Sequence, residues 1–498
     1  MARLHPEQIA IRFVESTTTR ERRAAAEDCA LEHWDRRIEL PGEEFLIMAV
    51  AASAEPYRTR RARSLTRLAR HRHVAEARPV FQRGRTRWLH TSRILVKPRA
   101  HGFAEVRRLV RGGGRIVHER HGTFLLQLGT GQDLLAEVRR LARMPSIEFV
   151  EPDYVVLGHH PGAGSAGARL AVAQLPFRLI RAAEGWKAGV ASPDILIAIL
   201  DCGVMTAHPD LHPAVALTYD ATTGRTDQSP PPWDSHGTSC AGLAAGAHSR
   251  REGVKGVAAG CRLLPVRVGR TPSRLGSYIT KSSWVCRGID WAWEHGAAVL
   301  SMSFGGGPRS AAVTAALRRA RTRGRQGKGA VLVASAGNGA GPRTPVEFPA
   351  TLPWVLAVAA TDNKDRPKRA PDNQNPWVSA SGPAVDIAAP GVGCYTATVP
   401  DPAEDELALY ISDFSGTSAA TPLVAGAAAL VIGANPALQE REIRRLLGDT
   451  ADRVGGLRYQ DGRNNQVGSG RLNVGAAIRA ARALADSSPT RDHARIAR

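Results

Sequence analysis

Cysteine is scarce and scattered in this 498-residue chain, and its six cysteines include no Cys-x-x-Cys pair. That spacing excludes the usual clusters of paired cysteine ligands and leaves two interpretations open, buried free thiols or a disulfide. Long apolar runs are also missing. We find no uninterrupted apolar stretch near the 18 or more residues that a membrane-spanning helix needs, so we expect no membrane segment.

The beginning of the chain lacks the pattern of an ordinary secretory signal. Residues 1–23 contain no continuous apolar stretch, and the first such run, residues 45–52, is short and follows two glutamates. This pattern favours a cytoplasmic protein by default. Export by another route, or a start codon placed elsewhere, would fit the same residues, so the compartment stays open.

Lysine is rare and arginine abundant, with seven Lys and 60 Arg against 46 acidic residues, which gives a net charge of +21. Such a skew follows from codon composition as easily as from function. The most basic run, residues 58–73, has seven arginines but no interleaved aromatic residues and no nucleic-acid-binding motif. We therefore favour a solvated helix face or a linker here, and we expect no nucleic-acid partner.

The composition, 43% apolar and 23% charged, is that of a folded chain. Residues 1–90 form a basic region without further assignment. From residue 93 the pattern runs strand, helix, two strands, helix and strand, which predicts a small α+β domain of βαββαβ order at 91–157. A Gly-rich stretch at 158–171 then indicates an exposed linker.

The remaining residues alternate short apolar runs with helical segments. The apolar runs are nearly continuous, as expected for strands buried on both faces of a parallel sheet. They lie at 194–200, 297–304, 330–337 and 354–360, with candidate helices at 277–296 and 311–324. The pattern predicts an α/β domain with a doubly wound parallel sheet over residues 172–485, followed by a polar tail at 486–498.

Three polar residues stand where elements of this domain begin or end. Asp201 closes the first buried run, at the strand end where function gathers in open α/β sheets. His236 begins a helix of small residues. Ser418 lies near the start of another, where unpaired N–H groups suit a developing negative charge. Taken singly, each residue fits a structural role such as a helix cap.

Taken together, the three residues follow the order Asp, His, Ser, which is the subtilisin order. Short flanking segments also occur in the expected sequence. They are HPDL (208–211), HGTSCAG (236–242), SFGG (303–306), AGNG (336–339), AAPG (388–391) and GTSAATP (416–422). The chain therefore resembles the subtilisin-like serine proteases, or subtilases, over about residues 172–480.

The resemblance implies a serine endopeptidase acting on proteins or peptides. Ser418 would attack the scissile carbonyl, His236 would carry the proton, and Asp201 would orient the imidazole. Asn338 would donate its amide to the oxyanion together with the backbone N–H of Ser418. An extended substrate would align on one edge segment, whose residues are Ser303, Phe304, Gly305 and Gly306.

The upstream α+β domain resembles the inhibitor-type propeptide of the family, which ends in a VEPD-like strand, here FVEPDY (149–154). This resemblance implies a zymogen that is blocked by its own propeptide. The family pattern also places Glu347 at the floor of the primary specificity pocket, which implies cleavage after Lys or Arg. Two alternatives stay open, in which Glu347 turns outward or pairs with Arg343. A basic preference would make Arg169-Leu170 the maturation site.

Departures from the family pattern are few. Cys202 follows Asp201 and Ala419 follows Ser418, and both residues are small. The segment 248–255 lacks the Asn-rich calcium loop of secreted subtilisins, so calcium at Asp210 is weakly supported. We expect no required cofactor, no metal in the site, and a monomer.

Other functional classes compete with a protease. A catalytically silent subtilase fold could serve as a binding module, but that would require a replaced triad or oxyanion residue. A nucleic-acid-binding protein has only the net charge in its favour. A lipase or esterase is excluded by the chain order and by the missing G-x-S-x-G motif around Ser418. Secretion, the habit of the family, competes with the cytoplasmic default.

Overall fold

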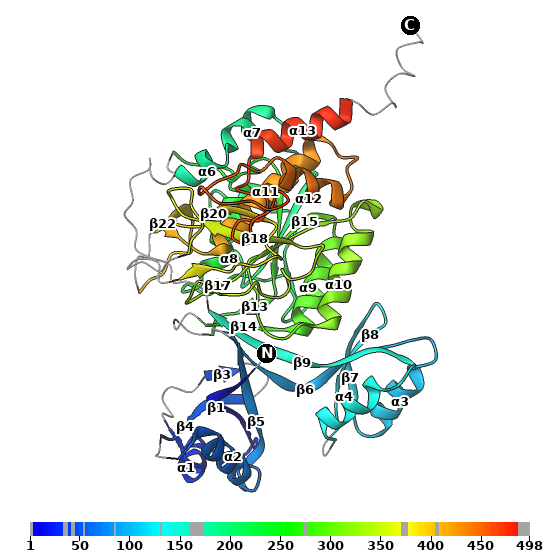
Figure 1. Ribbon diagram of the computed structural model, residues 1–498. Helices are drawn as coiled ribbons and strands as arrows, with labels where there is room; N and C mark the ends of the chain where they lie inside the picture. Colours follow the sequence, from blue (N-terminus) through cyan, green and yellow to red (C-terminus); the bar gives the residue numbers. More distant parts are fainter. Residues whose placement is uncertain are drawn as a thin grey trace. The chain divides into compact units, whose positions relative to one another are not determined.

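The chain forms two compact units, which we describe separately from a computed structural model (Figure 1). The first unit comprises Met1–His159 with two short later pieces, Ser277–Ser283 and Ser310–Ala312, and the second comprises the rest. The structure describes residues 3–32, 38–40, 45–52, 55–83, 86–129, 132–159, 174–251, 253–272, 274, 277–369, 377–403 and 408–486. Residues 160–171 of the predicted linker, its Arg169-Leu170 bond and the polar tail from residue 487 lie outside these residues, whereas residues 158 and 159 belong to a strand.

The N-terminal half of the first unit is an antiparallel sheet with two helices. Its elements are β1 (Arg3–Phe13), α1 (Thr19–Asp28), β2 (Leu31–Glu32), β3 (Ile38–Leu40), β4 (Phe45–Val50), α2 (Tyr57–Leu68) and β5 (Val74–Arg83). β1 pairs with both β4 and β5. Alternate residues of β1, Ile9, Ile11 and Phe13, are buried in one core with Met48 of β4 and Leu68 of α2. The region that the sequence left unassigned is therefore a folded layer of sheet and helices.

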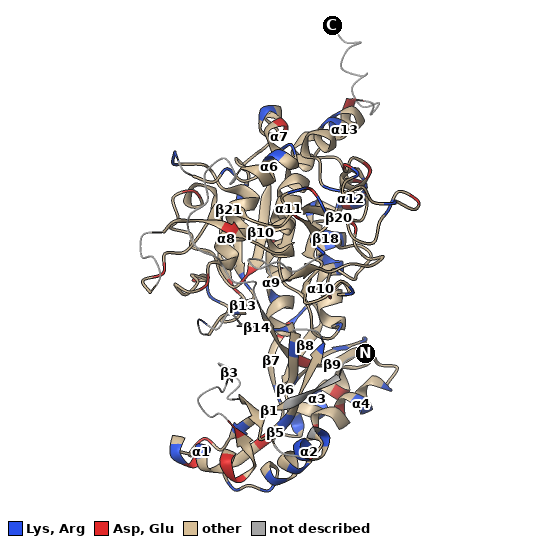
Figure 2. Ribbon diagram, turned by 60° about the vertical axis from the view of Figure 1, so that its left-hand side comes forward, with Lys and Arg blue, Asp and Glu red and all other residues tan. Residues whose placement is uncertain are grey.

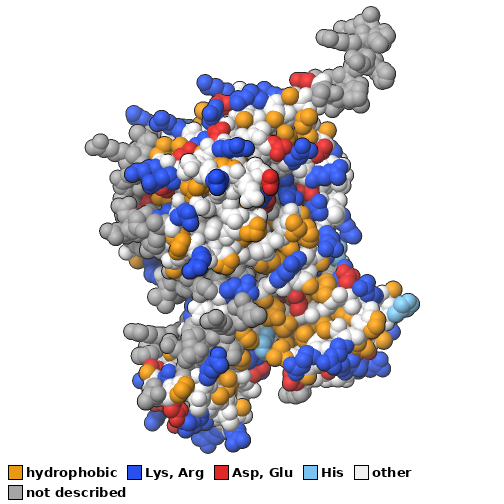
Figure 3. All heavy atoms as spheres, viewed as in Figure 1, with side chains coloured by type: hydrophobic (Ala, Val, Ile, Leu, Met, Phe, Trp, Pro, Cys, Tyr) orange, Lys and Arg blue, Asp and Glu red, His pale blue; other side chains and the backbone are white. Residues whose placement is uncertain are grey.

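The basic run of this region lies mainly on α2, where Figure 2 marks Lys and Arg in blue. Several of its arginines have partners within the unit. Arg63 pairs with Glu55 at 2.9 Å, Arg60 donates to the carbonyl of Ala51, and Arg61 is buried. On the face shown in Figure 3, cationic side chains are scattered among acidic and apolar ones.

The second half of the first unit has the order βαββαβ. Its elements are β6 (Thr86–Pro98), α3 (Phe103–Arg111), β7 (Arg115–Arg120), β8 (Thr123–Gln127), α4 (Leu134–Ala142) and β9 (Ile147–His159). The apolar residues of both helices pack with those of β6 and β8 around Ile94, Leu109, Leu126 and Leu141. β6 belongs to both halves, because it pairs with β5 near its beginning and with β8 and β9 farther along.

Two buried carboxylates of β9 hold the later pieces of this unit. Asp153 accepts hydrogen bonds from the backbone N–H and the hydroxyl of Ser283, at 2.9 and 2.8 Å. Glu151 accepts from the N–H groups of Ala311 and Ala312, at 2.8 and 3.1 Å. These donors lie at helix beginnings, where N–H groups lack intrahelical partners and favour a negative charge. Burial nonetheless raises the pKa of Glu151.

The second unit is built on a parallel sheet of seven strands in the order β11-β12-β10-β15-β16-β18-β20. The strands are β10 (Leu196–Asp201), β11 (Tyr219–Asp220), β12 (Arg262–Arg267), β15 (Ala297–Met302), β16 (Val331–Ser335), β18 (Leu356–Thr361) and β20 (Ile387–Pro390). The strand order reverses beside β10, because β12 lies on one side of it and β15 on the other. In open α/β sheets a crevice for ligands forms at such a point. The predicted doubly wound α/β fold is thus confirmed.

Both faces of this sheet are buried, which explains the continuous apolar runs. Ile197 and Ile199 of β10 pack into one core, with α8 (His236–Ala245), α11 (Thr417–Ala434) and α13 (Val474–Asp486). Ala198 and Leu200 of the same strand face the opposite core, with α9 (Ser282–Glu294) and α10 (Ala311–Arg323). The four residues from Ile197 to Leu200 are all buried, and all four are apolar.

The structure corrects two expectations. The segment 277–296 was expected to be one helix, but its first residues form β14 (Ser277–Lys281), which pairs antiparallel with β9. An available strand partner outweighs local helix preference here. The expectation that no segment is apolar and long enough to span a membrane was also wrong. α11 reaches 18 residues with a mean hydropathy of 1.6, but 89% of it is buried inside the protein, as for a core helix.

The described residues include all six cysteines, and no disulfide joins any two of them. Five of the six are buried, and burial raises the pKa of several thiols, that of Cys261 to about 11. Of the two interpretations that the sequence left open, the structure therefore has buried thiols.

Candidate active site

The end of β10 brings together the first two of the three residues singled out in the sequence. Asp201 is the last residue of β10, and His236 is the first residue of α8. The helix can approach the strand closely because Gly237 has no side chain: a Cβ there would lie 2.2 Å from the carbonyl oxygen of Gly203. The side chains at the end of β10 and at the beginning of α8 therefore face each other.

Asp201 and His236 form a tight buried pair. Nδ1 of His236 lies 2.9 Å from Oδ1 and 3.0 Å from Oδ2 of Asp201, and both residues are 4% exposed. Oδ1 of Asp201 also accepts the backbone N–H of Cys202 at 2.8 Å. Burial lowers the pKa of His236, but the Asp201 carboxylate and, to a smaller extent, that of Asp234 raise it, and the net shift is upward. The Asp201 carboxylate thus orients the imidazole and stabilises its cation.

Ser418 lies in the first turn of α11, next to the helix that carries His236. Pro422, four residues later, has no N–H to give to the Ser418 carbonyl, so this oxygen lacks its usual helical donor. Two other groups approach it instead, the hydroxyl of Ser303 at 3.0 Å and the thiol of Cys240 at 3.5 Å. Since Cys240 lies one turn after His236 on α8, these contacts hold Ser418 against the His236 helix. The Ser418 hydroxyl donates to the carbonyl of Ser303 at 3.3 Å.

The fourth predicted residue, Asn338, is bound to the same helix beginning. Its Oδ1 accepts from the backbone N–H of Thr417 at 2.9 Å and from the Thr417 hydroxyl at 3.1 Å. A backbone N–H can only donate, so these contacts establish which side-chain atom is the oxygen. The amide nitrogen of Asn338 is thereby left to donate to another group.

The predicted substrate segment follows β15 directly. Ser303 is buried, and its hydroxyl donates to the carbonyl of Ser418. Its side chain therefore contacts α11 and does not face a ligand. Phe304, Gly305 and Gly306 are half-buried, and the N–H of Gly306 donates to the carbonyl of Phe348 at 2.9 Å. This contact brings the segment containing Glu347 alongside.

Glu347 lies between the chain segments that leave two neighbouring strands. A Cβ at Gly337, after β16, would lie 3.0 Å from the Glu347 carboxyl group, and one at Gly305, after β15, would lie 3.2 Å from it. The backbone N–H of Glu347 donates to the carbonyl of Ala336 at 2.9 Å, which ties the residue to this position. The side chain is half-buried, whereas Arg343 is exposed.

Comparison with known proteins agrees with this geometry. Residues 192–470 match the model of the subtilase family, a range of more than half the chain. The chain belongs to the subtilase family. It is therefore a serine endopeptidase, as the sequence predicted.

Individual relatives support the same assignment. Subtilisin E of Bacillus subtilis is 31% identical over 344 residues, which cover 68% of this chain and 77% of that protein. Thermitase of Thermoactinomyces vulgaris is 36% identical over 277 residues, which cover 56% of this chain and 88% of thermitase. The crystal structure of fervidolysin from Fervidobacterium pennivorans aligns with a TM-score of 0.61 at 23% identity, over 78% of this chain and 61% of that one, and shows the likeness of fold.

Subtilases need no cofactor for catalysis, but calcium binding is common among them, so we tested Asp210 as a calcium ligand. Asp210 is fully buried. Its carboxylate accepts the N–H of Ser249 at 2.5 Å, the N–H of Val254 at 2.7 Å and the hydroxyl of Tyr410 at 3.0 Å. A calcium site needs several oxygen ligands facing one point, whereas here three donors face one carboxylate. The residues around Asp210 do not fit calcium.

One group of metal-ligand atoms occurs among the residues that the structure describes: those of Asp201, His236 and Cys240 lie within 4.8 Å of one another. Two of these residues are already hydrogen bonded to each other, so this group belongs to the subtilase centre.

Sequence reasoning missed one carboxylate in this subtilase site. Asp234 is 4% exposed, and its Oδ1 accepts the backbone N–H of His236 at 3.1 Å. An acidic residue two positions before the histidine was the available indication. Its burial depends on the loop containing Thr271, whose hydroxyl donates to Oδ2 at 2.5 Å.

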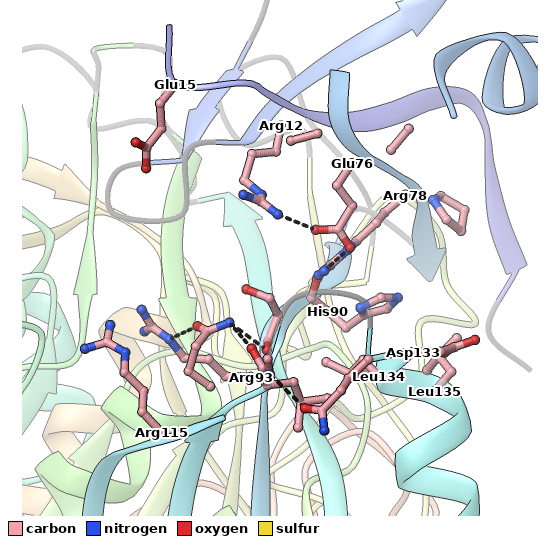
Figure 4. A pocket seen from close by; sticks show the side chains of 18 residues that line it. Arg12, Glu15, Glu76, Arg78, His90, Arg93, Arg115, Asp133, Leu134 and Leu135 are labelled. Carbon is pink, nitrogen blue, oxygen red and sulfur yellow. Dashed lines mark hydrogen bonds and ion pairs between the residues drawn. The ribbon is translucent and has the colours of Figure 1, made fainter. Parts of the chain in front are cut away.

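A separate cavity of about 970 Å³ lies within the first unit (Figure 4). Three of its charged side chains pair with one another. Arg12 donates to Glu76 at 3.3 Å, and Arg78 pairs with the same carboxylate while donating to the carbonyl of His90. The lining mixes four arginines with three carboxylates, so its charge indicates no class of ligand.

Proposed function

We propose that this subtilase is made as a zymogen, that Asp201, His236 and Ser418 form its catalytic triad, and that it prefers to cleave after Lys or Arg. Ser418 Oγ attacks the scissile carbonyl while His236 accepts its proton and returns it to the leaving amine. Asp201 stays ionised and stabilises the imidazolium. The Asp201–His236 pair, with two N–O distances of 3.0 Å or less in a buried site, is the observation that carries this proposal.

Stabilisation of the oxyanion falls to Asn338 and to the beginning of α11. The N–H of Thr417 binds the amide oxygen of Asn338, which leaves the amide nitrogen as the donor that this proposal assigns to the oxyanion. The backbone N–H of Ser418 lies in the first helical turn, where it has no carbonyl partner within the helix. Two such donors aimed at the developing charge are the usual basis of an oxyanion hole.

Residues 91–157 act as the inhibitory propeptide in this proposal. The βαββαβ order of β6 to β9 and the segment FVEPDY within β9 support this role. Cleavage in the segment 158–171 would then release the mature enzyme, and Arg169-Leu170 is the bond that a basic preference selects.

Glu347 would set this preference. Its carboxyl group lies against Gly305 and Gly337, two residues without side chains at the ends of β15 and β16. A carboxylate in a half-buried position between backbone segments is a suitable partner for the cation of a substrate Arg or Lys.

The zymogen is tested by intact mass and N-terminal sequencing of purified wild type beside Ser418→Ala. We expect the wild type to begin within residues 158–172 and the variant to stay full length. A variant trimmed in the same way would show cleavage by another protease. If both proteins stay full length in assays that vary pH and calcium, the proposal of an autocatalytic zymogen is wrong.

The specificity is tested with mature wild type and Glu347→Gly on a peptide library. Wild type should prefer Arg and Lys before the cleaved bond, and the variant should lose this preference while retaining activity on casein. An unchanged cleavage profile would exclude Glu347 as the specificity residue without affecting the triad.

A further inference from the structure

Asp234 is a second buried carboxylate beside the catalytic pair. It lies in the loop that precedes α8, two residues before His236. Oδ1 accepts the backbone N–H of His236 at 3.1 Å, and Oδ2 accepts the hydroxyl of Thr271 at 2.5 Å. Each carboxyl oxygen therefore accepts a hydrogen bond, which favours the ionised form of the group.

An anion at this position is costly unless a cation compensates it. Burial raises the pKa of Asp234, and the neighbouring Asp201 carboxylate raises it further, whereas the Thr271 hydroxyl and His236 act in the opposite direction. Two carboxylates thus share a site with little access to water. The imidazole of His236, on which both carboxylates act, is the group that gains a proton during catalysis.

Few other charges face His236. Cys202 follows Asp201, and Cys240 lies one turn along α8, but burial raises the pKa of both thiols well above its usual range, so they stay neutral. β22 (Tyr410–Phe414) contributes the Phe414 ring, edge-on at 5.5 Å. Arg267, at the end of β12, pairs with Asp220 at 3.5 Å. The charge balance at His236 therefore depends mainly on the two aspartates.

We propose that Asp234 is a positioning residue whose negative charge stabilises the imidazolium form of His236, in addition to Asp201. Its hydrogen bond to the His236 backbone also holds the first turn of α8 in place. This inference rests on the proposed triad. Loss of the charge should make the imidazolium less stable and lower the pKa of His236.

A purely structural role predicts something different. If Asp234 only secures the beginning of α8, Asp234→Asn should behave like wild type, because the amide oxygen still accepts from His236. The amide nitrogen can donate to the Thr271 oxygen, so both contacts persist. The substitution removes the charge and little else.

The first experiment measures kcat and KM on labelled casein against pH for mature wild type and Asp234→Asn. Asp227→Asn is the matched control, since it removes a charge from an exposed position of the same loop. We expect the acid limb of kcat/KM for Asp234→Asn to move about one unit to lower pH, the ordinary size of such shifts. The plateau kcat should fall about tenfold with KM unchanged, because Asp234 is buried away from substrate. The control should match wild type.

An acid limb that coincides with wild type would overturn the proposal. If Asp234→Asn fails to mature, Thr271→Val takes its place. This variant removes the hydrogen bond that stabilises the anion, so the limb should again move to lower pH, and an unmoved limb would again overturn the proposal.

The second experiment needs no turnover. The pKa of His236 is measured by NMR of the full-length chain carrying Ser418→Ala, with and without Asp234→Asn. A lower pKa in the double variant supports the inference, and equal values refute it. The proposed triad fails separately, if Ser418→Ala cleaves casein as fast as wild type.

Discussion

Replacing Asp210 with alanine should destabilise the catalytic unit strongly. The substitution leaves three donors without their acceptor, namely the N–H groups of Ser249 and Val254 and the hydroxyl of Tyr410. A hydrogen bond to a charged group contributes about 1.5–3 kcal/mol. Ser249 is exposed and can recover water, whereas the N–H of Val254 is buried and cannot. We expect a net loss of about 3–5 kcal/mol, the usual cost of removing one partner of a buried charged contact.

Thermal unfolding of the full-length chain measures this loss. The Ser418→Ala background prevents autolysis, and all variants are scanned at one rate. At about 3 °C per kcal/mol, the apparent Tm should fall by about 10 °C in Asp210→Ala. The side chain of Asp210→Asn keeps one acceptor oxygen, so the apparent Tm of this variant should fall by about half as much. Asp227→Asn, at an exposed position, should match the parent protein.

The second part of the test measures the effect of calcium on the Tm. Because donors already occupy the Asp210 carboxylate, neither added calcium nor a chelator should move the Tm of the parent protein through this loop. Two results would refute the reasoning. One is a loss below about 1 kcal/mol in Asp210→Ala, the ordinary worth of a single hydrogen bond. The other is a calcium-dependent rise in Tm that disappears in Asp210→Asn.

Three further predictions concern the reaction. Asn338→Ala should lower kcat about 100- to 1,000-fold with little change in KM, a range measured at the oxyanion asparagine of subtilisin, and a loss below about tenfold would contradict the role. The Asp201 carboxylate raises the pKa of His236 despite burial, so activity should be lost as pH falls through a value above 6.5, and an acid limb below 6.5 would contradict this. Ser303→Ala removes the hydroxyl that donates to the Ser418 carbonyl and should cost about 1 kcal/mol in unfolding free energy and lower kcat several-fold. Ser303→Thr, which keeps a hydroxyl, serves as its control.

The parallel sheet was predictable because its central strands bury mainly apolar residues on both faces. β10 packs Ile197 and Ile199 into one core and Ala198 and Leu200 into the other. A buried strand of this kind is visible in the sequence without knowledge of its neighbours. The order of Asp, His and Ser was equally visible, and the structure adds the distances that join the first two of them.

Features that depend on distant partners could not be predicted. The segment 277–281 forms a strand because β9, more than a hundred residues earlier, pairs with it. The apolar residues of β1 acquire a core only when β4 and α2 return to cover them. Asp234 depends on Thr271, 37 residues later, for the hydrogen bond that makes its burial tolerable. Local preference carries no information about such pairings.

The continuity of β6 determines which pieces of this protein can exist separately. Its beginning pairs with β5, its later residues pair with β8, and β9 runs beside most of its length. A cut between residues 90 and 91 would divide a strand in the middle of a sheet, leaving two fragments with unpaired, aggregation-prone edges. A cut after residue 159 leaves every one of these pairings intact. Residues 1–159 therefore form one connected piece, and its two halves are not interchangeable modules.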